Sequence, residues 1–398
     1  MTALDRRDLP LRPPPPVEAF TRVGVLDVLR GASLVGALVV NLAVFSADGG
    51  SPGSGNRIEW WAATIREVLT DGKWYPVFAF LFGYSIALQL RGQVPLVVRR
   101  RRVARRLAIL GVLGVAHGLL LYRWDILFAY AVLGSLVYLA RRQSSRTLTI
   151  ASGALLAFGG WLATEPSIDA GSFGFQHTAG VPAIRIYEHG SLLNVMSLHA
   201  HNYLYNLTDE VLAQWPFVIA MMLLGLLAER HLLLTIATTI ERRARFAALS
   251  IGATALVWNF VSEDNGFDRQ SRITAFVGTL MTVGQAIGVI ALMTLSDRPR
   301  RWKHELATLG RLSLTNYLMQ SLICTTLLFG YGFGLGPHFT PLIQWLAVVG
   351  IVGVQLAFSH WWLRHHSKGP VEAFVSWWTH RDGHDPTTVR PGGVRRAH

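Results

Sequence analysis

Long apolar runs alternate with short polar segments along most of the chain. A helix that spans a membrane needs about 20 mostly apolar residues, and ten segments come near that length. The sequence therefore predicts an all-α fold, a polytopic membrane helix bundle of about ten transmembrane helices. The predicted spans are residues 24–46, 74–90, 104–122, 125–140, 147–164, 211–228, 245–261, 273–295, 305–329 and 341–363.

The two ends of the chain differ from its middle. Residues 1–21 are polar and rich in proline, which predicts a flexible cytoplasmic tail. Residues 22–370 form a single transmembrane helical domain in this interpretation, and residues 371–398 form a cytoplasmic C-terminal tail. The first apolar run is long and carries charges, so we expect it to stay as an anchor instead of being cleaved as a signal peptide.

The basic residues predict the orientation. With both termini in the cytoplasm, 28 of the 37 Lys and Arg residues fall in cytoplasmic segments and 7 in outer segments. An excess of Lys and Arg in cytoplasmic loops is the general rule for membrane proteins. We therefore expect both termini to be cytoplasmic. The net charge of +13 lies mainly in short loops, which argues against nucleic acid as a partner.

The composition supports the same interpretation, since 51% of the residues are hydrophobic and 15% are charged. The single cysteine, Cys324, excludes a disulfide framework. No Cys and His spacing typical of metal ligands occurs, so we expect no metal cofactor.

The first predicted span carries Asp27, Arg30 and Asn41 inside an otherwise apolar run. Ionisable groups in hydrocarbon usually face a bundle interior and mark function. Asp27 and Arg30 have the i,i+3 spacing of an ion pair, and Asn41 falls within roughly 20° of Arg30 around the helix. One face of this helix is therefore expected to look inward at a site. The alternatives are an ion pair that anchors the helix end and an asparagine that bonds a neighbouring helix.

The third and fourth predicted spans are joined by a very short link, residues 122–124. Such a tight hairpin keeps the helix ends adjacent, so we expect His117 and Asp125 to approach each other. A carboxylate that orients an imidazole makes a histidine an effective general base. The alternatives are Asp125 as a helix N-cap and His117 as a neutral hydrogen-bonding residue between helices.

Two outer segments are long. Residues 47–73 contain IEWWAATIREVL, which predicts a short helix along the membrane surface. Residues 165–210 are long enough to cap a cavity as a lid or re-entrant element, and a plain amphipathic connector is the alternative. His199 and His201 in this segment have i,i+2 spacing, which diverges on a helix and makes only a weak metal pair.

The ninth predicted span carries a polar stripe, Ser313, Asn316 and Gln320, at helical spacing. Arg311 lies near its cytoplasmic end, where an arginine can hold a phosphate of a cytoplasmic ligand or snorkel to lipid headgroups. Lys73 precedes the second span, at the outer interface, and is either an anion contact or another snorkelling side chain.

Several blocks of the sequence resemble the YeiB family of bacterial membrane proteins. They occur in the family's order and cover most of the predicted spans, whereas residues 145–300 match mainly in hydropathy. That family is similar to the transmembrane acyltransferases, which include the lysosomal heparan acetyl-CoA N-acetyltransferase and share the LDxxRG…N pattern of the first helix. The matching blocks are LDVLRGASLVGALVVN, DGKWYPVFAFLFGYSIALQL, RRLAILGVLGVAHGLLLYRWDILFAYAVLG, GRLSLTNYLMQSLICTTLLFGYGFGLG and KGPVEAF.

The resemblance implies acyl transfer across a membrane. Acyl-CoA, with acetyl-CoA as the simplest donor, docks on the cytoplasmic side, and the acyl group reaches an extracytoplasmic glycan, lipid or small-molecule hydroxyl or amine. The lysosomal enzyme has a catalytic histidine in the loop after its first helix, but residues 47–73 here contain none. We therefore expect His117 to deprotonate the acceptor, Asp125 to orient His117, and Asn41 to hold the thioester carbonyl or its oxyanion.

The same implied reaction needs contacts to the CoA phosphates. Arg30, Arg311 and the basic cluster Arg99–Arg106 are expected to attract them from the cytoplasm, although the cluster also serves as a topology determinant. Further expected cofactor contacts are Asp27, Asn316, Gln320 and Lys73.

Two other classes of function remain open. A transporter or flippase for an amphiphilic molecule also needs a polar-lined bundle, but no clear internal repeat of the transporter kind is visible. A structural subunit of an envelope complex does not need a histidine and an aspartate brought together by a hairpin. The expected partners are membrane lipid, acyl-CoA and the extracytoplasmic acceptor, and a second copy of the chain is a further candidate.

Overall fold

The computed structural model describes residues 16–46, 56–70, 74–91, 94–122, 125–162, 183–231, 251–254, 283–290 and 301–381. Within these ranges the regular structure is helical and no strand occurs, so the predicted all-α class is confirmed. Helices coincide with seven of the ten predicted spans, and the span at 305–329 is divided between two helices. The spans at 245–261 and 273–295 lie mostly outside the described residues. Lys73 also lies outside them.

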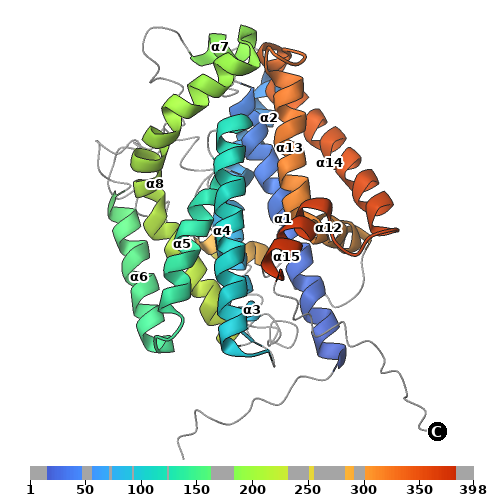
Figure 1. Cartoon of the computed structure of the whole chain (residues 1–398). Helices are drawn as coiled ribbons and strands as arrows, with labels where there is room; N and C mark the ends of the chain where they lie inside the picture. The colour runs from blue at the N-terminus through green and yellow to red at the C-terminus, as the bar shows by residue number, and fades with distance from the viewer. Residues whose placement is uncertain are drawn as a thin grey trace, which may run out of the picture.

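Most of the long helices stand side by side in one bundle (Figure 1). The long helices are α1 (Pro16–Phe45), α3 (Trp74–Gln89), α4 (Leu96–Leu120), α5 (Ile126–Ala140), α6 (Ser145–Leu162), α8 (Leu192–Arg230), α13 (Ser313–Leu328) and α14 (Pro341–Leu363). Shorter elements are α2 (Arg57–Thr70), α7 (Ala183–His189), α12 (Arg301–Arg311), the 3₁₀ turn η1 (Gly336–His338) and α15 (Pro370–Thr379). We call the end of the bundle where α2 and α7 lie the upper end, as drawn in Figure 1.

Helix α14 has the polarity of a helix in lipid. Its outward side chains are apolar, with Leu346 65% and Val349 70% exposed, whereas its polar Gln344, Gln355 and Ser359 are buried. A surface helix of a soluble protein has the reverse distribution. The outer face of α14 is therefore suited to hydrocarbon and its inner face to hydrogen bonding within the bundle.

Three helices among the described residues are long and apolar enough to cross a membrane, and α5 is a shorter apolar helix. The three segments are Gly24–Ala43, Leu96–Leu120 and Pro341–Leu363. Together with the polarity of α14, they identify a membrane protein.

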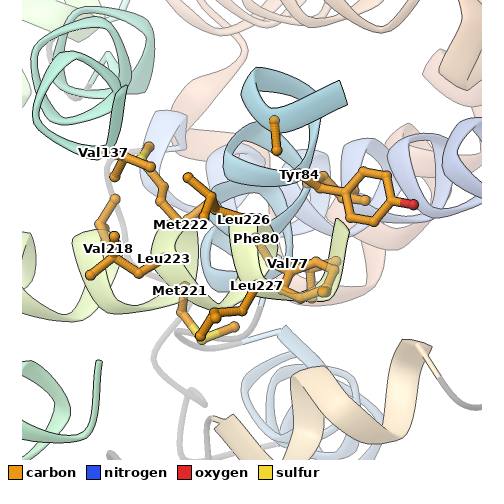
Figure 2. Close-up of a cluster of buried hydrophobic side chains, with 14 of the residues drawn as sticks. Val77, Phe80, Tyr84, Val137, Val218, Met221, Met222, Leu223, Leu226 and Leu227 are labelled. Carbon is orange, nitrogen blue, oxygen red and sulfur yellow. The ribbon is translucent and has the colours of Figure 1, made fainter. Parts of the chain in front are cut away.

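The core of the bundle lies where α3 and α8 cross. Figure 2 shows side chains of both helices packed together with Val137 of α5. The two helices cross so closely that only glycine fits at the contact. A Cβ atom on Gly83 would lie 2.0 Å from the carbonyl oxygen of Met222, and a Cβ atom on Gly225 would lie 2.0 Å from the carbonyl oxygen of Phe80. Small residues that allow such approach are typical of helix pairs in membranes.

A second close crossing joins α1 to α12. A Cβ atom on Gly31 would lie 1.9 Å from the carbonyl oxygen of Leu306, and one on Gly310 would lie 1.9 Å from that of Asp27. This contact holds α12 against the middle of α1, close to the ionisable residues of that helix.

The ninth predicted span is not one helix, so the prediction of a continuous span at 305–329 was wrong. Helix α12 ends at Arg311 and α13 begins at Ser313, with Leu312 between them in a non-helical conformation. Figure 1 shows α12 lying at an angle to the upright α13. The contact of Gly310 with the Asp27 carbonyl holds the end of α12 against α1.

The break leaves the first backbone N–H groups of α13 without carbonyl acceptors in a preceding helical turn. The carboxylate of Glu372 in α15 accepts hydrogen bonds from them. Its Oε1 accepts from the backbone N–H groups of Leu314 and Thr315 at 2.8 and 3.1 Å. Residues 370–379 are therefore a docked helix, whereas we had expected a tail from 371 onwards. At the other end of the chain, α1 begins at Pro16, inside the expected tail of residues 1–21.

The upper end of the bundle is covered by short elements. Helix α2 confirms the predicted helix in residues 47–73, and its Arg66 donates to Gln344 of α14 at 2.6 Å. Helix α7 lies over the loop after α13, where Gly330 donates its backbone N–H to the carbonyl of Tyr187. This part of the predicted cap, residues 183–189, therefore covers the upper end of α13.

Candidate functional site

The centre of the candidate site is the pair His117 and Asp125. His117 lies in the last turn of α4 and Asp125 immediately precedes α5, and the His117 Nδ1 atom is 2.8 Å from Asp125 Oδ1. The predicted approach of these two residues is confirmed. It requires Gly114, because a Cβ atom there would lie 2.5 Å from the Asp125 carboxylate and 2.3 Å from the backbone nitrogen of Phe128.

Asp125 also serves as the N-cap of α5. Its Oδ2 accepts from the backbone N–H of Phe128 at 2.8 Å, while Oδ1 faces His117. The N-cap alternative and the pairing with the imidazole are thus both satisfied by one carboxylate. The cap fixes the position of the carboxylate, which in turn fixes the ring.

The other ring nitrogen of His117 meets a residue that the sequence analysis did not single out. His117 Nε2 is 2.9 Å from the hydroxyl oxygen of Ser321 in α13. The side chains of His117 and Asp125 are 1% and 0% exposed, and Ser321 is equally buried. Because the Asp125 carboxylate can only accept, the imidazole proton lies on Nδ1, so Nε2 is the acceptor and the Ser321 hydroxyl is the donor. The three side chains therefore form a hydrogen-bonded chain from the Ser321 hydroxyl through the His117 imidazole to the Asp125 carboxylate.

Asn41 of α1 is joined to this group through Tyr122. The Tyr122 hydroxyl donates to Asn41 Oδ1 at 3.1 Å, and the Tyr122 ring centroid is 6.2 Å from that of His117. This contact brings Asn41 of α1 to the level of His117 in the bundle. Since Oδ1 accepts from the tyrosine, the Nδ2 amide is the end of Asn41 that can donate to a ligand.

Aromatic rings pack against this part of α4. The Tyr317 ring centroid is 4.9 Å from that of His117, and the Tyr203 ring lies against Gly118, one residue after the histidine. This packing keeps water from the imidazole and strengthens its two hydrogen bonds.

A second polar group lies lower in the bundle, around the middle of α1. Arg30 pairs with Asp27 at 3.1 Å and donates to the Ser85 hydroxyl of α3 at 2.8 Å. The predicted Asp27–Arg30 pair is confirmed. Arg311 acts electrostatically on Asp27, and Arg106 lies near enough to Arg30 to repel it. Arg30 and Arg311 thus act on the Asp27 carboxylate, and Arg106 lies near Arg30, so this group carries more positive than negative charge.

Asn316 and Gln320 do not face the arginines. The Asn316 amide donates to the Leu309 carbonyl and to the Ser359 hydroxyl, both at 3.1 Å, and the Gln320 amide donates to Gln355 at 3.0 Å. These bonds join α13 to α12 and α14, as interhelical polar residues do in membranes. Their predicted role as cofactor contacts stays a prediction.

The histidines of the upper segment take different positions. His199 is buried, with Nε2 3.1 Å from the Tyr187 hydroxyl, whereas His201 is exposed. Among the residues that the structure describes, no three His, Cys, Asp or Glu side chains converge as metal ligands.

Ser321, Tyr122 and Ser85 were not predicted from the sequence as partners of the site residues. Ser321 follows Gln320 directly and so lies about 100° away on the helix, off the predicted polar stripe. The spacing of Ser321 could have indicated its position. Ser321 lies one turn after Tyr317 and one turn before Thr325, so these three residues form a second polar face on the same helix.

Comparison with known proteins supports the resemblance. Residues 214–382 match a family described as "Protein of unknown function (DUF418)". The chain is 29% identical to the "Uncharacterized protein YxaH" of Bacillus subtilis (strain 168), over 89% of this chain and 95% of that protein. It is also 29% identical to the "Uncharacterized protein YeiB" of Escherichia coli (strain K12), over 87% of this chain and 93% of that protein. No solved structure matches.

These matches extend over nearly the full length of both relatives. The predicted resemblance to the YeiB family is confirmed. No acyltransferase is among these matches, and the names of these relatives give no activity.

Proposed function

We propose that this YeiB-family membrane protein is an acyltransferase, which moves an acyl group from acyl-CoA to an acceptor on the other side of the membrane. The observation that carries the proposal is the buried imidazole of His117, placed between the Asp125 carboxylate and the Ser321 hydroxyl at 2.8 and 2.9 Å. A histidine ordered at both nitrogens in a dry site is prepared for proton transfer.

The residues around His117 fit the charge changes of acyl transfer. When a nucleophile attacks a thioester, the base receives a proton and the carbonyl oxygen becomes an oxyanion. The Asp125 carboxylate stabilises the imidazolium that results, and its position at the N-cap of α5 costs no further reorganisation. The Asn41 amide, held through Tyr122, is the proposed donor to the oxyanion.

The arginines lower in the bundle are the proposed contacts for the CoA phosphates. Arg30 and Asn41 lie eleven residues apart on α1, which corresponds to about 16 Å along the helix axis. An extended pantetheine arm can bridge such a distance, so that the phosphates stay near Arg30, Arg106 and Arg311 while the thioester reaches His117. Planar guanidinium groups suit phosphate oxygens.

The proposal also sets the orientation of the chain. The lower end of the bundle would face the cytoplasm, where acyl-CoA is made, and the upper end would face the outside of a bacterial inner membrane. Both termini would then be cytoplasmic, in agreement with the distribution of Lys and Arg. The acceptor would be a glycan, a lipid or a small molecule with a hydroxyl or amine group, reached beneath α7.

A transporter or flippase is the second candidate. The observation that favours it is the break between α12 and α13, because discontinuous helices often hold substrate ions in transporters. In this chain the Glu372 carboxylate accepts hydrogen bonds from the N–H groups at the start of α13, so these groups are not free to bind a substrate ion. The break is therefore a weaker argument than the ordered imidazole.

The experiment uses the purified chain in liposomes. Acetyl-CoA and longer acyl-CoA thioesters are added on one side with a cell-envelope extract as acceptor, and release of free thiol is followed. We expect turnover that falls on the order of 10²–10⁴-fold in His117→Ala. His201→Ala is the matched control, because His201 is exposed and lies outside the site.

The two candidate functions give different results. Thiol release that depends on His117 supports the acyltransferase. No thioester turnover with any donor, together with movement of a labelled amphiphile between leaflets, would support the transporter. Equal activity of His117→Ala and the wild type would remove the assignment of the base.

A further inference from the structure

We infer that Ser321 is a nucleophile, which accepts the acyl group as an ester before the acceptor does. This inference rests on the proposed acyl transfer and adds a covalent step to it. It also assigns a function to a hydroxyl that would otherwise be only a bonding partner of His117.

The hydrogen bonds of two other buried serines show how Ser321 differs from them. Ser33 and Ser152 each donate to the carbonyl of the residue four positions earlier in their own helix, at 2.8 Å. This is the common state of serine inside a helix. The Ser321 hydroxyl instead reaches out of α13 to the imidazole of α4, at 2.9 Å. Its oxygen is thus held beside a base and not beside a carbonyl.

Ser321, His117 and Asp125 are arranged as the groups that activate a serine nucleophile. A serine hydroxyl is a weak nucleophile until a neighbouring base takes its proton, and the base must itself be oriented by a third group. His117 is that base, and Asp125 is the orienting group. Because the side chains of both are almost fully buried, the imidazole cannot turn toward water without breaking two hydrogen bonds.

The chemical step balances without any further reactant. The Ser321 oxygen attacks the carbonyl carbon of the acyl thioester, and its proton passes to His117 Nε2. The carbon–sulfur bond then breaks, and the CoA sulfur leaves with the proton that His117 returns. The products are an acyl ester on Ser321 and free CoA.

The second half returns the enzyme to its starting state. The acceptor hydroxyl or amine gives a proton to His117 Nε2 and attacks the ester carbonyl. The bond to the Ser321 oxygen breaks, and that oxygen takes back the proton from His117. No oxidant, metal or second cofactor takes part.

A covalent step suits a reaction between two sides of a membrane. CoA carries phosphate charges that hydrocarbon does not accept, so only the acyl group has to pass from the lower to the upper side of the site. If Ser321 holds that group, CoA can leave before the acceptor arrives. The two substrates then need not occupy the bundle together.

The test looks for the ester directly. The full-length protein is incubated with radiolabelled acetyl-CoA without acceptor, denatured, and digested for mass spectrometry. We expect label on the peptide that contains Ser321, release of this label by hydroxylamine, and less than about a tenth of the label in Ser321→Ala and His117→Ala. Ser152→Ala is the matched control, since Ser152 is buried to the same extent but bonds its own helix.

A second measurement does not depend on CoA. Fluorophosphonate probes react with activated serines, because the serine oxygen attacks phosphorus and fluoride leaves. We expect the probe to modify Ser321 in the wild type and in Ser152→Ala, but not in His117→Ala. Ser321→Cys keeps a nucleophile at the same place and is expected to form a thioester with the acetyl group.

The outcomes separate this inference from the proposed function. Turnover of acyl-CoA that is equal in wild type and Ser321→Ala, with no labelled protein, overturns the inference and leaves direct transfer by His117 standing. Absence of thioester turnover with modification of Ser321 by the probe overturns the acyl-CoA proposal and keeps the nucleophile. Absence of both overturns both.

Discussion

The carboxylate of Glu372 in α15 accepts a hydrogen bond from the hydroxyl of Thr315 in α13 at 2.5 Å. The same carboxylate accepts two backbone N–H groups at the start of α13. A residue near the end of the described chain therefore fixes the beginning of the helix that carries Ser321. The helix has no side-chain cap of its own, because Leu312 occupies the N-cap position.

The first prediction concerns this cap. We expect Glu372→Ala to lower the free energy of unfolding by about 1–2 kcal/mol, since N-cap bonds contribute that much and the N–H groups are partly buried. Thermal unfolding in detergent, followed by tryptophan fluorescence, measures the change.

Glu59 provides the comparison for this prediction. It accepts the backbone N–H of Leu342 at the start of α14 in a similar way, but in an exposed position. Water can replace it there, so Glu59→Ala should lower stability less than Glu372→Ala. An equal loss in the two variants would contradict the argument.

The second prediction separates the two roles of Asp125. Asparagine is as good an N-cap as aspartate, so Asp125→Asn should keep the bond to Phe128 and fold with stability close to the wild type. It cannot stabilise an imidazolium, so we expect thioester turnover to fall on the order of 10³–10⁴-fold. Asp125→Ala, which loses both roles, should also unfold at a lower temperature. Full activity of Asp125→Asn would leave the residue as a cap only.

The sequence was sufficient to predict the pair His117 and Asp125 because a short link constrains both helix ends. The same holds for Asp27 and Arg30, which are neighbours on one helix. These predictions needed only local geometry. Asn41 was predicted from its helical phase with Arg30, and the structure joins it to the site through Tyr122.

The partners contributed by distant helices were not predictable in the same way. Ser321 meets His117 only because α13 is rotated so that its Tyr317 face points at α4, and the periodicity of α13 alone does not fix that rotation. The break at Leu312 has no proline to mark it. It depends on Gly310 lying against α1, which is a contact between segments nearly three hundred residues apart.

The third prediction concerns that contact. We expect Gly31→Ala and Gly310→Ala to destabilise the protein by about 1–3 kcal/mol, because each added methyl group would meet a backbone carbonyl at 1.9 Å that cannot move aside. Gly24→Ala, on the same helix as Gly31, is the control. Nothing lies within 4 Å of its Cβ position, so it should be neutral or slightly stabilising.

The measurement is the unfolding temperature together with the yield of monodisperse protein in detergent. An unfolding temperature of Gly31→Ala equal to that of Gly24→Ala would show that α1 and α12 can separate without cost. In that case the close crossing would not be what orients α12.

The last prediction concerns the arginines around Asp27. If they hold the CoA phosphates, Arg311→Gln should raise the KM for acetyl-CoA several-fold and leave kcat nearly unchanged, because the lost contact is the same in the ground state and the transition state. Arg311 is exposed, so its removal does not leave a buried charge without a partner. The KM of the wild type should also rise with salt, and more steeply than that of the variant, since salt screens the attraction. Arg364→Gln is the control, because Arg364 is exposed beyond the end of α14 and outside this group. An equal rise of KM in both variants would mean that the arginines attract CoA only through the general positive charge of this end of the bundle.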